Sequence, residues 1–587
     1  MKNIISNRLM ICRNIVVGVM TASTLLFSSC NEDKFLREVP LSFYAPENSY
    51  VTYDNFNSAL MNLYSIVRDN VFAPESGGRP PGIMYVCSEM VVASNNHNGI
   101  PNWASVLLPT SGAVVDNTWT PWYRIIYDAN VIIGRTNSPV SELTDSEKIL
   151  IEAEARFFRA FCYRMLAQLY GGVPLVLVET AEPKRDYVRA TREAVYQQCV
   201  DDLLFAVREL PNITEVDDAR ISKQVAQHLL SEIYICLKEW QNAIDAATAV
   251  ISHPAMGLMT VRFGVRKDEK PDPRWPWANG GDVYWDLFRN GNQNRSSGNK
   301  ESLWVLQYKF MTPGGFSTGG HGTERQLIPR IWQASVRNTI SGTAARPVIP
   351  EPNTYYFGRG SGMQRPSHYF FQTIWKRSGF DQDMRNSEYN IVRDFIVNNP
   401  ASDHNGKWLF KDNVPINLVS FDDTTRNFFP AIAKASDPGK HPQELYHSNQ
   451  TVPGSLTNVA QNSFTNQYVF RLAETYLLRA EAYLGQGNKT MAAADINTVR
   501  GRAKAPAVDP ADVDIDYLLD ERARELHWEE FRLLTLTRLG KFVERVRKYN
   551  PAPGASVRDY HNLWPIPYGE IEKNTEAVLE QNPDYIN

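Results

Sequence analysis

The feature that most constrains the fold is a pair of similar segments that lie far apart in the chain, at residues 229–250 and 478–499. Four residue types recur at a constant offset: Glu232 with Glu481, Tyr234 with Tyr483, Ala243 with Ala492, and Val250 with Val499. In each copy, a helical pattern runs into a short polar turn and is followed by an alanine-rich helical pattern. Small residues let two helices approach closely, so each copy predicts a helical hairpin of the tetratricopeptide-repeat type.

Other parts of the chain supply helices for these hairpins to pack against. Apolar residues recur at helical spacing over 54–67, 119–133, 146–170 and 192–210. Because an isolated hairpin cannot bury its apolar face, the two copies must pack with neighbours, and the helices over 146–170 and 192–210 are the natural candidates. We therefore predict a mainly α-helical, tetratricopeptide-like scaffold that is assembled from both ends of the chain.

The middle of the chain, residues 259–465, lacks this periodicity. Gly, Pro, Asn and aromatic residues dominate it, and one strand is predicted over 303–310. The whole chain has 13 Trp, 27 Tyr and 26 Phe, whereas disordered segments are poor in aromatic residues. The pattern therefore predicts an irregular folded lobe, and such loops are where binding residues concentrate.

The N-terminus has the pattern of an export signal. Lys2, Arg8 and Arg13 precede an apolar run over 15–27, which is too short to span a membrane. Cys30 follows two serines at the expected cleavage site, so we predict that it becomes the acylated first residue of a lipoprotein. Ordinary cleavage beside an incidental cysteine is the alternative.

These patterns divide the chain into four parts: a lipoprotein signal peptide over 1–29, an N-terminal helical region over 30–258, an irregular ligand-binding lobe over 259–465, and a C-terminal helical region over 466–587. The net charge of −4 becomes about −7 without the three basic signal residues, which argues against a nucleic-acid partner. Of the remaining cysteines, Cys162, Cys199 and Cys236 lie in helical apolar patterns and fit small buried hydrophobic residues. Together with Cys87 they show no metal-ligand spacing, and a disulfide stays open.

Several further segments resemble the SusD/RagB family, surface lipoproteins of Bacteroidetes that pair with TonB-dependent outer-membrane transporters. The segments, in chain order, are Cys30 with Glu32-Asp33, Arg156-Phe157-Phe158-Arg159-Ala160, Tyr170-Gly171-Gly172-Val173-Pro174, Arg471-Leu472-Ala473-Glu474, Ile496-Asn497-Thr498-Val499-Arg500, Glu521-Arg522-Ala523-Arg524-Glu525, Leu563-Trp564-Pro565-Ile566-Pro567 and Gln581-Asn582-Pro583-Asp584-Tyr585. Glu530 and Thr535 stand where the family commonly has Gly and Asp. The resemblance implies a helical fold with four tetratricopeptide-like hairpins. It also implies display at the outer membrane, and capture of an oligosaccharide or polysaccharide for a SusC-like transporter.

Two patterns resemble catalytic motifs. Gly315 and Gly319 frame a GxSxG sequence, but a nucleophile elbow needs a strand that passes directly into a helix, and glycines and a proline surround this one. The charged run over 520–532 offers paired carboxylates, yet their one-turn spacing beside arginines is typical of surface ion pairs on a helix. We therefore expect no catalytic residue, no enzyme activity and no cofactor, and the sequence leaves a bound calcium ion open.

Sugar binding asks for flat aromatic faces with amide or carboxylate groups around them, because a pyranose has a C–H face and a rim of hydroxyls. The candidates are tryptophans in polar loops, with asparagines nearby: Trp103 with Asn96 and Asn98, then Trp275, Trp277 and Trp332. The alternative for each tryptophan is burial in the core. We predict a non-enzymatic glycan-binding protein. The rival interpretations are capture of a peptide or another nutrient, a pure interaction scaffold, and a surface hydrolase.

Overall fold

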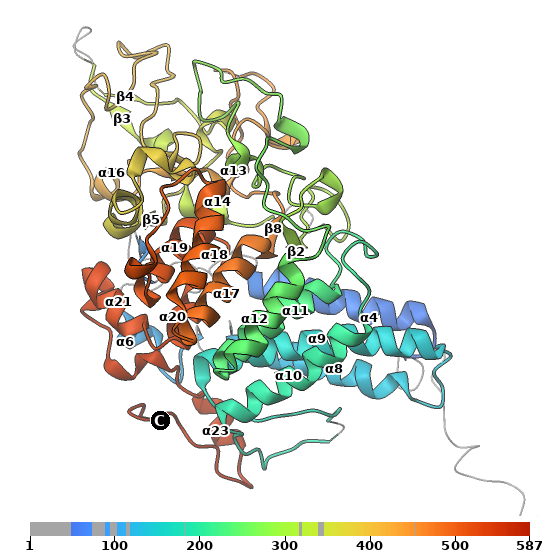
Figure 1. Cartoon of the computed structure of the whole chain (residues 1–587). Coiled ribbons are helices and arrows are strands. Elements are labelled where there is room, and N and C mark those ends of the chain that lie inside the picture. The colour runs from blue at the N-terminus through green and yellow to red at the C-terminus, as the bar shows by residue number, and fades with distance from the viewer. Residues whose placement is uncertain are drawn as a thin grey trace, which may run out of the picture.

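The computed structural model describes residues 49–72, 88–93, 102–112, 118–180, 182–315, 320–338, 345–450 and 452–586. The signal segment, Cys30, Asn96 and Asn98 lie outside these ranges. Helices are the main regular structure of the described residues, and the strands are few and short, so the mainly α-helical fold that the sequence predicted is confirmed (Figure 1).

Helices from both ends of the chain form the scaffold in the lower and central part of Figure 1. They are α4 (Tyr53–Ile66), α8 (Thr120–Thr136), α9 (Asp145–Tyr170), α10 (Arg192–Glu209), α11 (Lys223–Cys236), α12 (Trp240–Ile251), α17 (Leu472–Gly485) and α18 (Lys489–Arg502). Local signals set their limits. A capping box between Thr144 and Glu147 starts α9, and Gly171, with φ +76°, ends it.

The two predicted hairpins are confirmed as α11–α12 and α17–α18, and they pack on each other through α12 and α17. Ala243 and Ala247 of α12 and Ala482 of α17 are fully buried. At Gly485, an added Cβ would lie 2.5 Å from the Cδ2 atom of Trp240, so this close approach requires glycine. The first and last parts of the chain therefore form one continuous helical stack.

The C-terminal part completes the scaffold with shorter helices. These are α19 (Ile515–Leu526), α20 (Arg532–Arg538), α21 (Phe542–Tyr549), α22 (Pro551–Gly554) and α23 (Tyr568–Lys573). Helix α21 packs near α6 (Trp103–Val106) through the contact between Trp103 and Phe542. The thiols of Cys162 and Cys199 are buried and form no disulfide, and burial raises the pKa of each well above its ordinary value. Cys236 is half-buried and also forms no disulfide, and Cys87 lies outside the described residues. Both behave as the small core residues that the sequence predicted.

The middle of the chain forms a lobe at one end of the scaffold, at the top of Figure 1. Its regular elements are short: α13 (Val283–Asp286), α14 (Thr323–Leu327), α15 (Ile374–Lys376), α16 (Phe421–Thr425), and the antiparallel pairs β3 (Ser335–Val336) with β4 (Arg346–Pro347) and β6 (Ile391–Val392) with β7 (Ala431–Ile432). Strand β5 (Gln364–Pro366) of the lobe pairs antiparallel with β1 (Val91–Ala93), which comes from the N-terminal part of the chain. The lobe has its own hydrophobic core, which is rich in aromatic rings. The domain limits at 259 and 465 stay a prediction.

One strand pair connects the lobe to the scaffold. Strand β2 (Ser302–Leu306) pairs antiparallel with β8 (Gln467–Arg471), which leads directly into α17. The predicted strand over 303–310 is thus confirmed in its first half. Because the pair is antiparallel, residues after β2 and residues before β8 lie at the same edge of the ladder.

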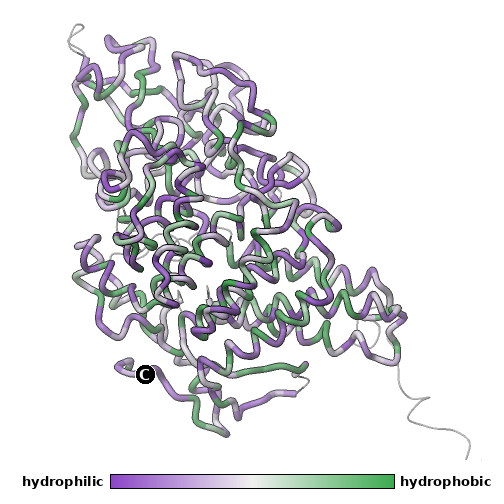
Figure 2. Tube along the Cα trace, viewed as in Figure 1, coloured by the Kyte–Doolittle hydropathy of each residue, from purple (hydrophilic) through white to green (hydrophobic). Residues whose placement is uncertain are grey.

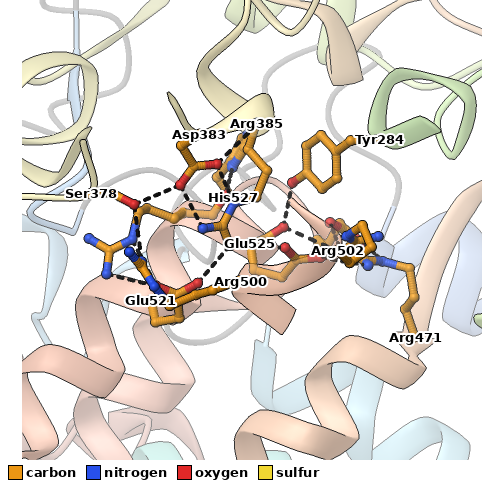
Figure 3. A network of polar contacts seen from close by, with 12 residues as sticks. Tyr284, Ser378, Asp383, Arg385, Arg471, Arg500, Arg502, Glu521, Glu525 and His527 are labelled. Carbon is orange, nitrogen blue, oxygen red and sulfur yellow. Dashed lines mark hydrogen bonds and ion pairs between the residues drawn. The ribbon is translucent and has the colours of Figure 1, made fainter. Parts of the chain in front are cut away.

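The prediction of surface ion pairs for the charged run 520–532 is wrong. Glu521, Arg524 and Glu525 are 0% exposed, and the run forms an internal network beneath the lobe (Figure 3). The Nη1 atom of Arg385, from the lobe, lies 2.7 Å from Oε1 of Glu521 and 3.1 Å from Oε2 of Glu525. Nη1 of Arg471, from β8, lies 2.8 Å from Oε1 of Glu525. The network therefore connects α19, the lobe and β8.

These carboxylates are held as anions. Burial alone would raise the pKa of Glu525, but Arg502 and two further arginines hold it well below its ordinary value. Burial would likewise raise the pKa of Glu521, but nearby arginines, Arg385 above all, lower it. Neither group is suited to donate a proton, so the carboxylate run is part of the fold rather than a glycosidase pair.

Hydrophobic and hydrophilic residues are interspersed along the scaffold helices (Figure 2). Within the residues that the structure describes, we find no helix with the length and apolar character that a membrane span requires.

Candidate binding site

Trp103, the first predicted stacking residue, lies inside the scaffold. Its side chain is 0% exposed, and its ring centroid is 4.8 Å from that of Phe542 in an edge-to-face contact. The backbone nitrogen of Trp103 donates to Oγ of Ser556 at 2.8 Å. The ring therefore has no open face, and its predicted partners Asn96 and Asn98 lie outside the described residues.

Trp275 and Trp277 belong to the core of the lobe. The ring of Trp275 stacks on Tyr355 with centroids 3.8 Å apart, and the guanidinium carbon of Arg274 lies 4.5 Å from its centroid. Trp277 is 1% exposed and donates from Nε1 to the carbonyl oxygen of Tyr355 at 2.7 Å. Protein groups cover the faces that a sugar would need.

Trp332 is the one tryptophan of the four predicted that is half-buried. It packs against the lobe core to which Trp275 and Trp277 belong, and its Nε1 donates to the carbonyl oxygen of Gly360 at 2.8 Å. The guanidinium carbon of Arg359 lies 5.1 Å from its ring centroid. The structure thus gathers three predicted residues in one lobe and places Trp103 in the separate scaffold core.

A cavity of about 850 Å³ lies where the lobe meets the edge of the β2–β8 ladder. Its walls are rich in amide side chains and in aromatic rings. The amides are Asn290, Asn294, Gln307, Gln443, Asn462 and Asn466, and the rings are Tyr308, Phe310, Tyr446 and Phe464. This volume falls in the range of small-molecule sites.

Two amide groups in this cavity are held in place and still have hydrogen-bonding capacity. Oδ1 of Asn294 accepts from Nε2 of Gln307 at 3.2 Å and from Nδ2 of Asn466 at 3.0 Å. Oδ1 of Asn466 accepts from the backbone nitrogen of Tyr308 at 3.0 Å, which extends the ladder. Within the described part of the chain, Nδ2 of Asn294 and Oε1 of Gln307 have no protein partner, so a donor and an acceptor remain for ligand hydroxyls.

Aromatic rings form an adjoining part of the wall. Phe310 is half-buried and meets Phe464 edge-to-face with centroids 5.0 Å apart. Tyr446 is also half-buried, and its hydroxyl donates to Oγ1 of Thr354 at 3.3 Å. These rings are supported from behind and partly open, which is the arrangement that a stacked sugar needs.

The buried carboxylates of the cavity are already bonded. Oε2 of Glu324 accepts from Oγ of Ser436 at 2.9 Å and lies 3.0 Å from Nε2 of His441. Burial alone would raise the pKa of Asp437, but Arg266 and Arg289 lower it, and its Oδ1 lies 2.6 Å from Nη1 of Arg266. These groups stabilise the wall and leave no free acid and base pair among them.

Within the described residues, no group of three or more His, Cys, Asp or Glu side chains has the arrangement of a metal site. Residues 316–319, which complete the GxSxG motif, lie outside the described structure.

Sequence reasoning missed the amide cluster of Asn294, Gln307 and Asn466 because its members come from three separate segments. A signal was present in the asparagine- and glutamine-rich stretch 290–294 and in the asparagines at 462 and 466, which flank the two strands.

Two family models match the chain. The model described as "SusD family" matches residues 352–585, and the model described as "Starch-binding associating with outer membrane" matches residues 81–235. SusD-like protein P25 of Formosa agariphila is 25% identical over 97% of this chain and 98% of its own length. Starch-binding protein SusD of Bacteroides thetaiotaomicron is 39% identical over 20% of this chain and 21% of its own length.

Solved structures share the fold. A laminarin-binding SusD-like protein superimposes with a TM-score of 0.63 at 21% identity, over 91% of this chain and 100% of its own. Surface glycan-binding protein A of Bacteroides thetaiotaomicron, in complex with laminarihexaose, has a TM-score of 0.63 at 18% identity, over 91% of this chain and 100% of its own. At these identities the likeness concerns the fold.

Proposed function

Because this chain belongs to the SusD/RagB family, we propose that it is a glycan-binding protein that captures oligosaccharide or polysaccharide at the cell surface and passes it to a SusC-like TonB-dependent transporter. The names of its relatives support carbohydrate as the ligand, since they include starch, laminarin and laminarihexaose. Association with the outer membrane agrees with the description of the matched N-terminal model.

The observation that carries this proposal is the amide and aromatic cavity at the edge of the β2–β8 ladder. Asn294 and Gln307 present a free donor and a free acceptor, and Phe310 presents a supported ring. A sugar uses these groups through its hydroxyl rim and its C–H face, respectively. The geometry supports binding without a reaction, because the buried carboxylates at the cavity are bonded to protein groups.

In this proposal the scaffold keeps the site rigid. The ladder is continuous with α17, and the buried ion network connects it to α19 and to the lobe (Figure 3). A site that is formed before binding loses little ordering entropy when a glycan enters. Lipid on Cys30 would hold the protein at the membrane, so Cys30→Ala is expected to move it from the membrane fraction to the soluble fraction.

Affinity electrophoresis of the purified protein tests the proposal. Native gels would contain laminarin, amylopectin, xylan, pectin or carrageenan, and retention in at least one of these gels is expected. Asn294→Ala should reduce retention in that gel. Asn137→Ala, which removes an exposed asparagine at the end of α8, is the matched control and should not.

Capture of peptides is the rival function. A protein that migrates freely in every polysaccharide gel but is retained by an immobilised peptide mixture would contradict glycan capture. Trp332→Ala tests the half-buried predicted tryptophan in the same gels, whereas Trp103→Ala and Trp275→Ala are expected to reduce stability first, because both rings are buried.

A further inference from the structure

A second cavity of about 550 Å³ lies beside the first, and the two share one edge. Gln307, Tyr308 and Lys309 line both cavities. The opposite wall of the second cavity comes from α4, through Met61, and from Arg68 just after it. The segment 307–309 is therefore a ridge between two hollows rather than the rim of one.

The ridge presents polar groups on its exposed face. Beyond β2 the chain continues with alternating burial: Gln307 and Lys309 are exposed, whereas Tyr308 between them is 4% exposed. Alternation of this kind puts the first and third side chains on one face. Within the described residues, the ammonium group of Lys309 has no side-chain or carbonyl partner, so it is a free donor beside the free amide oxygen of Gln307.

The loop that follows holds the ridge in place. The backbone nitrogen of Lys309 donates to the carbonyl oxygen of Gly315 at 2.9 Å, which closes the turn. A Cβ at Gly315 would lie 2.8 Å from the carbonyl oxygen of Lys309, so the turn requires glycine at this position. Arg68 donates from Nη1 to the carbonyl oxygen of Gly314, which fixes the loop to the scaffold.

We propose that one glycan chain crosses this ridge and occupies both cavities, so that the ligand is an extended oligosaccharide or an internal stretch of a polysaccharide rather than a mono- or disaccharide. The inference rests on the proposed function and adds the length of ligand that the site selects. Two separate short ligands fit the geometry less well, because each would need the same ridge residues. A single chain uses Gln307 and Lys309 once, from above, and its next units lie in the hollow against Met61.

Oligosaccharides of graded length test this inference. They would be prepared by partial acid hydrolysis of the polysaccharide that retains the protein, and their binding measured by isothermal titration calorimetry. We expect the Kd to fall by about tenfold between chains of two or three units and chains of six or more. Thr312→Trp, which places an indole in the second cavity only, should weaken binding of the long chains by about fivefold or more and leave the short chains unchanged.

Met311→Trp is the matched control, because Met311 is 63% exposed and lines neither cavity. Met61→Ala removes part of the far wall from α4 and should reproduce the chain-length effect without altering the loop. The inference is overturned if affinity is the same for short and long chains, or if the Thr312 and Met61 variants bind the long chains as tightly as the unmodified protein. Failure of the proposed function is a separate outcome, because no polysaccharide gel would then retain the protein.

Discussion

The contact between Gly485 and Trp240 offers a sharp test of how the two ends of the chain are joined. Gly485 ends α17, Trp240 begins α12, and these helices come from the two hairpins. In Gly485→Ala, the new Cβ would meet Cδ2, Cε3 and Cε2 of the indole at 2.5–2.7 Å. Such distances are far below a van der Waals contact, so the ring or the helix must move.

Two opposite effects decide whether Gly485→Ala raises or lowers the free energy of unfolding. Replacing glycine by alanine in a helix gains at most about 1 kcal/mol of intrinsic propensity, and less at a terminal position. Overpacking a close contact costs about 1–3 kcal/mol. We therefore expect Gly485→Ala to lower the free energy of unfolding by about 1–2 kcal/mol, even though propensity alone predicts stabilisation.

Urea unfolding followed by circular dichroism measures this difference through the midpoint. Gly134→Ala is the matched control, since Gly134 lies in α8 and an added Cβ there would have nothing within 4 Å, so this variant should gain up to about 1 kcal/mol. In a Trp240→Ala background, Gly485→Ala should no longer destabilise, which gives a coupling energy of about 1–3 kcal/mol. If Gly485→Ala stabilises the protein as much as Gly134→Ala does, the two hairpins are not packed at this contact.

Three further changes test the network and the site. Arg385→Met removes the arginine that pairs with buried Asp383 and one of several that neutralise Glu521 and Glu525, and it should cost about 3–5 kcal/mol in urea unfolding. Arg377→Met, at a half-exposed pair, should cost about 1 kcal/mol or less. Burial raises the pKa of Glu474 from 4.5 to about 7. The stabilisation that comes from protonating Glu474 is therefore present below pH 4.5 and is lost as the pH rises through 7. Glu474→Gln should stabilise the protein by up to about 3 kcal/mol at pH 8 and not at pH 4. An equal change in the free energy of unfolding at pH 8 and pH 4 would refute this assignment. Phe310→Ala should weaken glycan binding about fivefold by calorimetry with an unchanged circular dichroism spectrum, and an unchanged Kd would remove this ring from the site.

The scaffold could be predicted because its signals are local. Helical spacing, the Thr144–Glu147 cap and Gly171 mark α9 within one stretch of sequence, and the small residues of the hairpins carry their own packing information. The same spacing could not tell that the face carrying Glu521 and Glu525 is buried. Charged residues one turn apart look alike in water and inside a protein, and the arginines that neutralise them here include Arg385, more than 100 residues away in the chain.

The candidate binding residues were harder to predict for a related reason. An irregular lobe has few regular backbone ladders, so large apolar side chains must fill its interior, and Trp275 and Trp277 do so although both lie in a polar, proline-rich sequence. The amide cluster, in contrast, exists only because β2 pairs with β8 and brings Gln307 next to Asn466 across a large gap in sequence. In such a fold, then, strand pairing determines where a ligand can be held, and the polar residues that flank paired strands are better candidates for ligand contact than the buried tryptophans of the lobe.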